Sequence, residues 1–351
     1  MSIFKTSGIS IKGISVCVPK QIKSTYDYNH ISKEEQELFH KTVGIKERRV
    51  ADDKTTCSDL CEKAANYFFE NNITNRENID IIIFVSQSPD YFLPSTAIIL
   101  QDKLKLKKSV LAFDITLGCS GYVYGLSVLA GFMQSGQFKQ ALLLCGDKST
   151  ISTFEGDKSA YPLFGDAGTA TLIEYDKNAS ELTFNLNSDG SGKNAIIIEH
   201  GHSRHPYDSS SETIYEPEPG IKRAKKHLAL NGQDIFTFAL KEVPPNINET
   251  LTAAGKNKSE IDFFILHQAN KLINETVRKK LGIEKEKCPS SIELFGNTSS
   301  ASIPLTMCFG LEQQLTKESL TLLLCGFGVG LSWGSVVINT SELSCAKIIE
   351  L

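Results

Sequence analysis

Residues 109–121 read Ser109-Val110-Leu111-Ala112-Phe113-Asp114-Ile115-Thr116-Leu117-Gly118-Cys119-Ser120-Gly121. The apolar start of this run is typical of a buried strand, and a helical repeat of apolar residues follows it, formed by Val123, Leu126, Ala130 and Met133. Cys119 is thus predicted at a strand-to-helix turn, where the glycines allow a tight backbone and close approach of a substrate. The N–H groups and positive dipole end of the helix favour its thiolate. Cys119 is therefore a candidate nucleophile, although the pattern also fits a small buried apolar residue.

The second half of the chain repeats the pattern of the first. Residues 77–85 resemble residues 259–267, and Ile292–Phe295 takes the place of the strand before Cys119 and leads to a turn with Asn297. Two similar α/β halves, predicted as residues 1–175 and 176–351, pack about a pseudo-twofold axis. Equivalent turns then face one another, which brings Cys119, His267 and Asn297 together near that axis.

The composition indicates a soluble globular protein in a reducing compartment. The chain has 351 residues, a formal net charge of −4, and nine cysteines that are scattered rather than regularly spaced. The charge gives no reason to expect binding to nucleic acid or to an anionic membrane. The odd cysteine count disfavours a disulfide framework and, with no apolar leader at the start, predicts a cytoplasmic location. The longest apolar run, Leu322–Ile338, is broken by glycines, which favours two buried strands over a membrane span.

Several other motifs permit a functional interpretation, and each has a plainer one. Cys57 and Cys61 lie one helical turn apart but lack further ligands, so they are expected to be apolar face residues. The irregular segment 199–226 contains four possible metal ligands, Glu199, His200, His202 and His205. Their spacing fits one face of neither a helix nor a strand, so an exposed loop is favoured over a metal site. The basic runs Lys222–Lys226 and Arg278–Lys280 could receive an acidic partner or simply be solvated.

The chain resembles the β-ketoacyl-acyl-carrier-protein synthase III family, within the thiolase-fold condensing enzymes, nearly from end to end. The resemblance rests on motifs that occur in the family's order: residues 44–49 (Gly-Ile-Lys-Glu-Arg-Arg), 94–97 (Pro-Ser-Thr-Ala), 117–121 around Cys119, 164–168 (Phe-Gly-Asp-Ala-Gly), 267–270 (His-Gln-Ala-Asn), 296–304 around Asn297, and 326–334 (Gly-Phe-Gly-Val-Gly-Leu-Ser-Trp-Gly).

This resemblance implies a five-layer αβαβα fold, a homodimer and a Cys-His-Asn active site at Cys119, His267 and Asn297. In the implied reaction, an acyl group moves from its thioester to the cysteine, and malonyl on acyl carrier protein then loses CO₂ to give an enolate. The histidine and the asparagine amide would stabilise that enolate, and the backbone N–H groups of Cys119 and Val329 would hold the tetrahedral oxyanion. No metal or redox cofactor is expected, because the substrates are carried on coenzyme A or on the phosphopantetheine of the carrier protein.

The resemblance also suggests substrate contacts and shows departures. Gln268 and Asn270 would contact substrate, and Leu93 would reach across the dimer interface into the partner's acyl pocket. Residues that bind coenzyme A in the family are replaced: Leu38 stands for a Trp, Thr42 stands for an Arg, and no Arg lies near Lys148. In addition, Leu272 replaces an Arg that is implicated in docking of the carrier protein. We therefore expect a primer on a carrier protein, or weak binding of coenzyme A thioesters.

Three alternatives keep the fold but change the activity. The first is an acyltransferase that moves an acyl group from Cys119 to an alcohol or amine without decarboxylation; Asn297 favours condensation over it. The second is a thiolase, for which Cys325 is the only candidate base. The third is a scaffold half of a heterodimer, which an intact Cys-His-Asn set disfavours.

Overall fold

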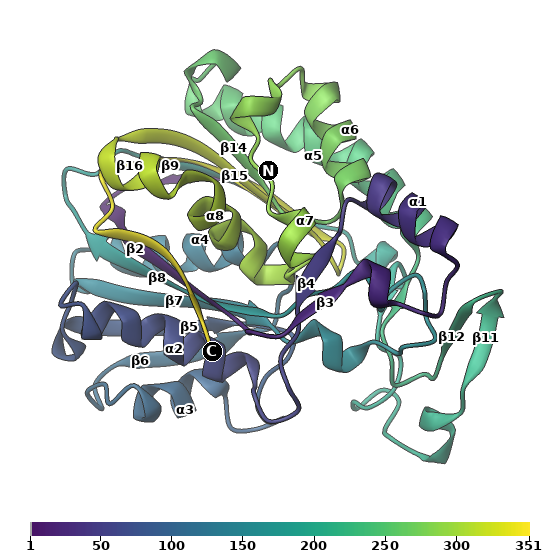
Figure 1. Ribbon diagram of the computed structural model, residues 1–351. Helices are drawn as coiled ribbons and strands as arrows, with labels where there is room; N and C mark the ends of the chain where they lie inside the picture. Colours follow the sequence, from purple (N-terminus) through teal and green to yellow (C-terminus); the bar gives the residue numbers. More distant parts are fainter. Residues whose placement is uncertain (1) are drawn as a thin grey trace.

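The computed structural model describes residues 2–351 and contains two large β-sheets (Figure 1). The first sheet has the order β17-β2-β8-β7-β5-β6, with bounds Cys345–Glu350, Ile9–Val18, Ala167–Tyr175, Gln140–Asp147, Ile79–Val85 and Leu111–Ile115. The second has the order β1-β9-β16-β15-β14, with bounds Ile3–Thr6, Leu182–Ser188, Ser332–Thr340, Leu320–Gly328 and Phe263–Leu266. The remaining strands form short pairs, β3 (Ile22–Ser24) with β4 (Glu47–Arg49), β10 (Ile196–Ile197) with β13 (Ala229–Leu230), and β11 (Tyr215–Glu218) with β12 (Ile221–Arg223).

The helices cover both faces of both sheets. Two helices, α4 (Gly121–Met133) and α8 (Ser302–Lys317), share one central core with the inner faces of the two sheets. The outer face of the first sheet packs on α2 (Cys57–Glu70) and α3 (Thr96–Lys103), and that of the second packs on α5 (Gly232–Ala254) and α6 (Lys271–Leu281). The predicted five-layer αβαβα fold is therefore confirmed. The short helices α1 (Lys33–Val43) and α7 (Ile292–Phe295) lie outside these layers.

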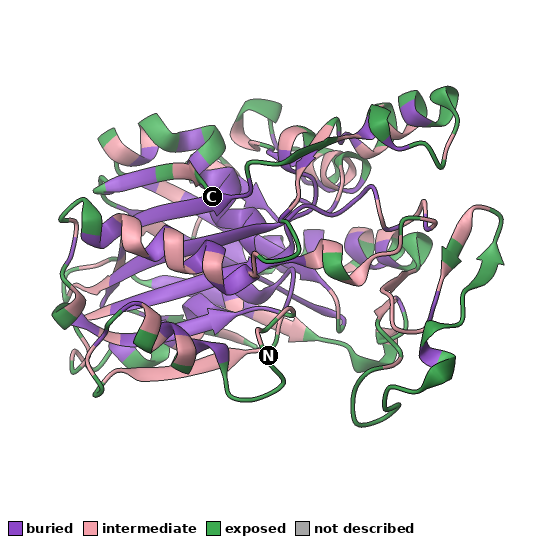
Figure 2. Cartoon of the chain, turned by 60° about the horizontal axis from the view of Figure 1, so that its bottom comes forward, coloured by how far each residue is buried: buried purple, intermediate pink, exposed green. Residues whose placement is uncertain are grey.

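The side chains of the central strands explain why their sequences are continuously apolar. Along β5, Ile81, Ile83 and Val85 enter the central core, whereas Ile82 and Phe84 enter the outer core against α2 and α3. Strands buried on both faces need apolar residues at every position rather than at alternate ones. The same holds for β15 and β16, which confirms that the run from Leu322 to Ile338 is two buried strands. Figure 2 shows this buried centre. No helix within residues 2–351 is long and apolar enough to cross a membrane.

Two features of the second half differ from the simple repeat. Ile292–Phe295, expected in place of a strand, is the short helix α7, whose last turn is closed by the Gly296 N–H donating to the Ile292 carbonyl over 3.0 Å. The second sheet therefore has no counterpart of β6. In addition, the halves exchange their terminal strands, because β1 pairs with β9 and β17 pairs with β2. The division at residue 175 stays a prediction.

The segment 199–226 is largely exposed, in agreement with the loop interpretation, and carries the hairpin of β11 and β12 (Figures 1 and 2). The rings of His200 and His205 stack with centroids 5.3 Å apart. Within residues 2–351, no group of three or more His, Cys, Asp or Glu side chains is arranged to hold a metal ion. Cys57 and Cys61 are both buried in the outer core of the first sheet.

Candidate active site

Cys119 lies between β6 and α4, and its side chain is buried. The end of β15 comes so close to it that a Cβ on Gly328 would lie 2.8 Å from the Cys119 Sγ. A Cβ on Gly326 would likewise lie 2.8 Å from the Cys119 carbonyl oxygen. Glycine at these two positions therefore lets the second half of the chain contact the cysteine directly.

Opposing effects act on the pKa of the Cys119 thiol. Burial and, to a lesser extent, the nearby Asp147 carboxylate together raise the pKa of the thiol to about 11. The Ser299 hydroxyl, 4.0 Å from the sulfur, and the backbone N–H groups of Val329 and Cys119 favour the thiolate but do not outweigh burial. The N–H groups at the helix N-terminus therefore act in the predicted direction, but desolvation of the charged sulfur has the larger effect on the pKa.

His267 directly follows β14 and faces the same space. Its backbone N–H donates to the Cys325 carbonyl over 2.8 Å, which continues the parallel pairing of β14 with β15. The ring Nδ1 lies 2.7 Å from the Ser302 hydroxyl, and the ring meets Phe327 edge to face at 5.5 Å. Burial lowers the pKa of His267 to about 3, so the imidazole is neutral at pH 7 and can donate one N–H.

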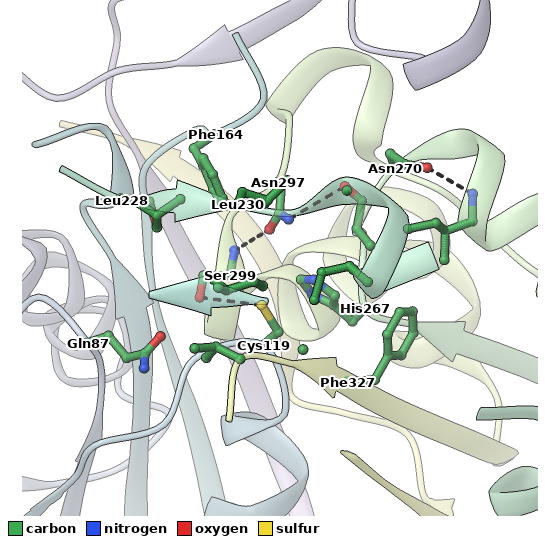
Figure 3. Close-up of a pocket in the computed structure, with 18 residues that line it drawn as sticks. Gln87, Cys119, Phe164, Leu228, Leu230, His267, Asn270, Asn297, Ser299 and Phe327 are labelled. Atoms are coloured by element: carbon green, nitrogen blue, oxygen red, sulfur yellow. Dashed lines mark hydrogen bonds between the residues drawn. The ribbon is translucent and has the colours of Figure 1, made fainter. Parts of the chain in front are cut away.

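Asn297 is held by its backbone and oriented by its amide oxygen. Its N–H donates to the Leu163 carbonyl over 2.9 Å, and its Oδ1 accepts the Ser299 N–H over 2.9 Å. The Nδ2 has only a 3.5 Å contact, with the Ala269 carbonyl, so it keeps a proton free for a ligand. Figure 3 shows Asn297, His267 and Cys119 converging on one space.

All three residues line a single cavity whose space of about 660 Å³ includes its opening to solvent. One side of the cavity runs between the N-termini of α5 and α6, past Ile235, Asn270 and Ile273. The cavity is also lined by Gln87, Ser149, Phe164 and Leu228, and by Ile196 and Leu230 from the β10–β13 pair. Val329 lines the cavity as well, as expected for an oxyanion donor.

The other predicted substrate contacts are placed differently. Asn270 lines the cavity and accepts the Ile273 N–H at the start of α6 over 2.8 Å. Gln268 is not part of the cavity wall: its buried amide accepts from the Ser290 hydroxyl over 2.8 Å and donates to the Leu266 carbonyl over 2.8 Å. These hydrogen bonds shape the turn that holds His267, and a role of Gln268 in substrate binding stays a prediction. Leu93 is 74% exposed and does not line the cavity of its own chain.

Several residues at the site carry no motif of their own that marks them in the sequence. Asp147, at the end of β7, is buried and accepts the Gln87 N–H over 2.7 Å and the Ser300 hydroxyl over 2.9 Å. Ser299 contributes its hydroxyl near Cys119 from a left-handed backbone, with φ 50°. Two features of the sequence could have indicated them: Ser299 belongs to the polar run around Asn297, and the carboxylate of Asp147 follows the apolar residues of a buried strand.

Most cations of the basic runs pair with nearby carboxylates, whereas Lys279 and Lys280 form no ion pair within residues 2–351. Lys225 pairs with Glu199 at 3.1 Å and Lys226 with Glu212 at 3.0 Å. Arg223 pairs with the buried Asp157 at 2.9 Å, Lys222 with Glu216 at 3.9 Å, and Arg278 with Glu275 at 2.8 Å. These runs are therefore weaker candidates for an acidic partner than their sequence indicates. Cys325, the only candidate thiolase base, is fully buried in β15 and does not line the cavity.

Comparisons with known proteins agree with this geometry. Residues 113–190 match the family model described as 3-oxoacyl-[acyl-carrier-protein (ACP)] synthase III, and residues 251–340 match the model of its C-terminal part. The chain is 31% identical over 331 residues to β-ketoacyl-[acyl-carrier-protein] synthase III of Streptococcus pneumoniae (strain Hungary19A-6), covering 94% of this chain and 98% of that protein. It is 30% identical over 332 residues to the protein of the same name from Oceanobacillus iheyensis, with the same coverage.

Solved structures give the same result. The crystal structure of 3-oxoacyl-(acyl-carrier protein) synthase from Burkholderia xenovorans LB400 superposes with a TM-score of 0.94 at 36% identity, over 99% of both chains. The crystal structure of 3-oxoacyl-[acyl-carrier-protein] synthase III from Aquifex aeolicus VF5 superposes with a TM-score of 0.80 at 29% identity, over 94% of this chain and 99% of the other. The similarity thus spans both halves of the fold.

Proposed function

The chain belongs to the 3-oxoacyl-[acyl-carrier-protein] synthase III family, and from this premise we propose that it condenses an acyl thioester with malonyl-acyl carrier protein through an acyl-Cys119 intermediate. The observation that carries the proposal is the meeting of Cys119, His267 and Asn297 at one cavity, with both candidate oxyanion donors directed at the sulfur.

In the first step the Cys119 sulfur attacks the thioester carbon. A bond forms between that sulfur and the acyl carbon, the bond to the carrier's sulfur breaks, and the thiol proton passes to the leaving thiolate. The tetrahedral oxyanion accepts hydrogen bonds from the backbone N–H groups of Cys119 and Val329. Because Cys119 is a thiol at rest, these donors act mainly on charge that develops during the reaction.

In the second step malonyl-acyl carrier protein enters the acylated site. Loss of CO₂ leaves an enolate whose oxygen accepts hydrogen bonds from a neutral His267 N–H and from the Asn297 Nδ2. One such donor is typically worth about 3–4 kcal/mol of transition-state stabilisation. The carbanion then attacks the acyl carbon, the bond to Cys119 breaks, and a proton from solvent restores the thiol. No step changes a net oxidation state, so the scheme uses no redox cofactor.

The partners and location are parts of this proposal. The donors would be acyl thioesters of coenzyme A or of carrier protein, and the enzyme would be a cytoplasmic homodimer. The exposed side chains of Tyr91, Phe92 and Leu93, at 63%, 74% and 74%, support a contact between two copies at this loop. Light scattering of the purified chain and of Leu93→Asp tests the dimer.

The test of function separates its two steps. Intact mass after incubation with acyl donors should rise by one acyl unit, and Cys119→Ala should abolish that adduct. His267→Ala and Asn297→Ala should still accept the acyl group but release little CO₂ from malonyl-acyl carrier protein. Acylation without any CO₂ release by the unmutated protein would instead favour the acyltransferase alternative.

A further inference from the structure

One side of the cavity near Cys119 combines polar and apolar walls. Gln87 lies on the side of Cys119 opposite His267 and Phe327, in the direction of Phe164 and Leu228 (Figure 3). Ser149 also lines the cavity. An acyl group on the cysteine that extends away from His267 therefore meets a carboxamide and a hydroxyl beside an aromatic ring and a leucine.

The topology of the first sheet places these residues together. Cys119, Gln87 and Ser149 follow β6, β5 and β7, which are neighbouring parallel strands, so their carboxyl ends meet at one edge. The backbone of Gln87 is fixed because its N–H donates to the buried Asp147 carboxylate over 2.7 Å. The Gln87 side chain is thus attached to a rigid support although it is open to solvent in the single chain.

Gly118 brings the carboxamide next to the cysteine. A Cβ at this position would overlap the Gln87 Oε1 and would lie 3.1 Å from the Ser299 hydroxyl. The missing Cβ therefore leaves room for the Gln87 amide directly beside the residue that precedes Cys119.

These polar groups have no partner within the protein. Among residues 2–351, neither the Gln87 carboxamide nor the Ser149 hydroxyl makes a hydrogen bond to another protein group. In a largely apolar cavity, a few placed polar groups fix the orientation of a ligand, and a ligand that lacks the matching atom leaves them unpaired.

We propose that the acyl group accepted by Cys119 carries an oxygen close to the thioester, as in a 3-oxoacyl or 3-hydroxyacyl group, and that Gln87 and Ser149 bind this oxygen. The carboxamide can donate to a ketone or accept from a hydroxyl, and the serine hydroxyl can do either. This inference rests on the proposed acyl-Cys119 intermediate, since it assigns the substrate class of the same site.

The experiment compares two acyl groups of equal chain length. The rates of Cys119 acylation by acetoacetyl-pantetheine and butanoyl-pantetheine are measured by intact mass in the unmutated protein, in Gln87→Leu and in Ser149→Ala. The two thioesters differ in intrinsic reactivity, but this difference is the same for every protein variant. A change in the ratio of the two acylation rates therefore reports the effect of the substituted side chain. The preference for acetoacetyl should fall at least tenfold in Gln87→Leu and several-fold in Ser149→Ala. Gln313→Leu, an exposed glutamine on α8 outside the cavity, should keep the full preference.

The outcomes distinguish this inference from the proposed function. If both donors acylate Cys119 and their ratio is the same in the unmutated protein and in Gln87→Leu, the polar wall plays no part in selection and the inference is overturned while the proposed function stands. If no donor acylates Cys119, the proposed function fails and the inference fails with it. Equal urea midpoints for Gln87→Leu and the unmutated protein show that the variant is folded.

Discussion

The Asp147 carboxylate accepts the Ser300 hydroxyl over 2.9 Å, and this hydrogen bond joins the end of β7 in the first half to the turn that carries Asn297 in the second. The same carboxylate accepts the Ser300 N–H over 3.3 Å. It forms no ion pair within residues 2–351, and burial raises its pKa. Asp147 is therefore a positioning residue whose charge also acts on Cys119.

Asp147→Asn should make Cys119 more reactive toward iodoacetamide at pH 8. The substitution keeps the side-chain shape but removes the negative charge that raises the cysteine pKa, so the midpoint of alkylation against pH should move down. Loss of hydrogen bonds to the carboxylate should cost about 1–3 kcal/mol of folding stability. Asp166→Asn, which changes a buried carboxylate elsewhere, is the control and should leave the Cys119 midpoint unchanged. An unchanged or higher midpoint in Asp147→Asn would show that the charge does not reach the thiol.

His267 should make the protein less stable as the pH falls. Its pKa is about 3 in the folded state against 6.5 for an unperturbed histidine. Between these two values the imidazole is protonated in the unfolded chain but stays neutral in the folded chain. The stability is thus fully present above pH 6.5 and is lost as the pH falls toward 3, by about 2 kcal/mol at pH 5. Urea unfolding at pH 7 and pH 5 should show this loss in the unmutated protein, and His267→Gln should lack that part of it. If the free energy of unfolding fell equally between pH 7 and pH 5 in both proteins, burial of His267 would not be the cause of the loss.

Gly328→Ala should lower the rate of Cys119 acylation at least tenfold, because its Cβ would lie 2.8 Å from the sulfur and must displace it from the oxyanion donors. Gly131→Ala is the matched control: no atom lies within 4 Å of the Cβ that it adds to α4. That control should keep the acylation rate and gain up to about 1 kcal/mol in stability from better helix propensity. Stopped-time intact mass measures both rates, and full activity of Gly328→Ala would refute the close packing described.

Leu93→Phe should shift donor preference toward short acyl groups if this residue enters the acyl pocket of a second copy. A larger ring would shorten the space available to the primer. Acylation by acetyl and hexanoyl thioesters is compared in the unmutated protein, in Leu93→Phe and in Leu272→Phe, where Leu272 is 52% exposed on α6 and lies outside the cavity wall. An unchanged donor profile in Leu93→Phe would remove Leu93 from the pocket.

The layers of the fold and the meeting of Cys119, His267 and Asn297 at one cavity could be predicted because they depend on local pattern and internal repetition. A buried strand followed by a glycine turn fixes where Cys119 lies, and the repeat brings the other two residues to the same place. Their catalytic roles stay a prediction.

The properties that could not be predicted depend on distant parts of the chain. The thiol state of Cys119 is set by burial beneath both halves, and Lys226 is neutralised by Glu212 only because the exposed loop folds back. Gln87 has no sequence signature, since its place at the site follows from the order of strands in the sheet. The helix at residues 292–295 ends at Gly296, whose φ of 65° suits a turn better than a strand.

The exchange of terminal strands constrains the order of folding during synthesis. β2 leaves the ribosome early, but β17, the strand that covers its open edge, follows every other strand of the two large sheets in chain order. Until then the edge of the first sheet presents unpaired backbone groups, a state that favours association with other nascent chains. The half that carries Cys119 is therefore translated first, but its sheet is completed only when β17 has been made, so chaperone protection during translation matters most for this half.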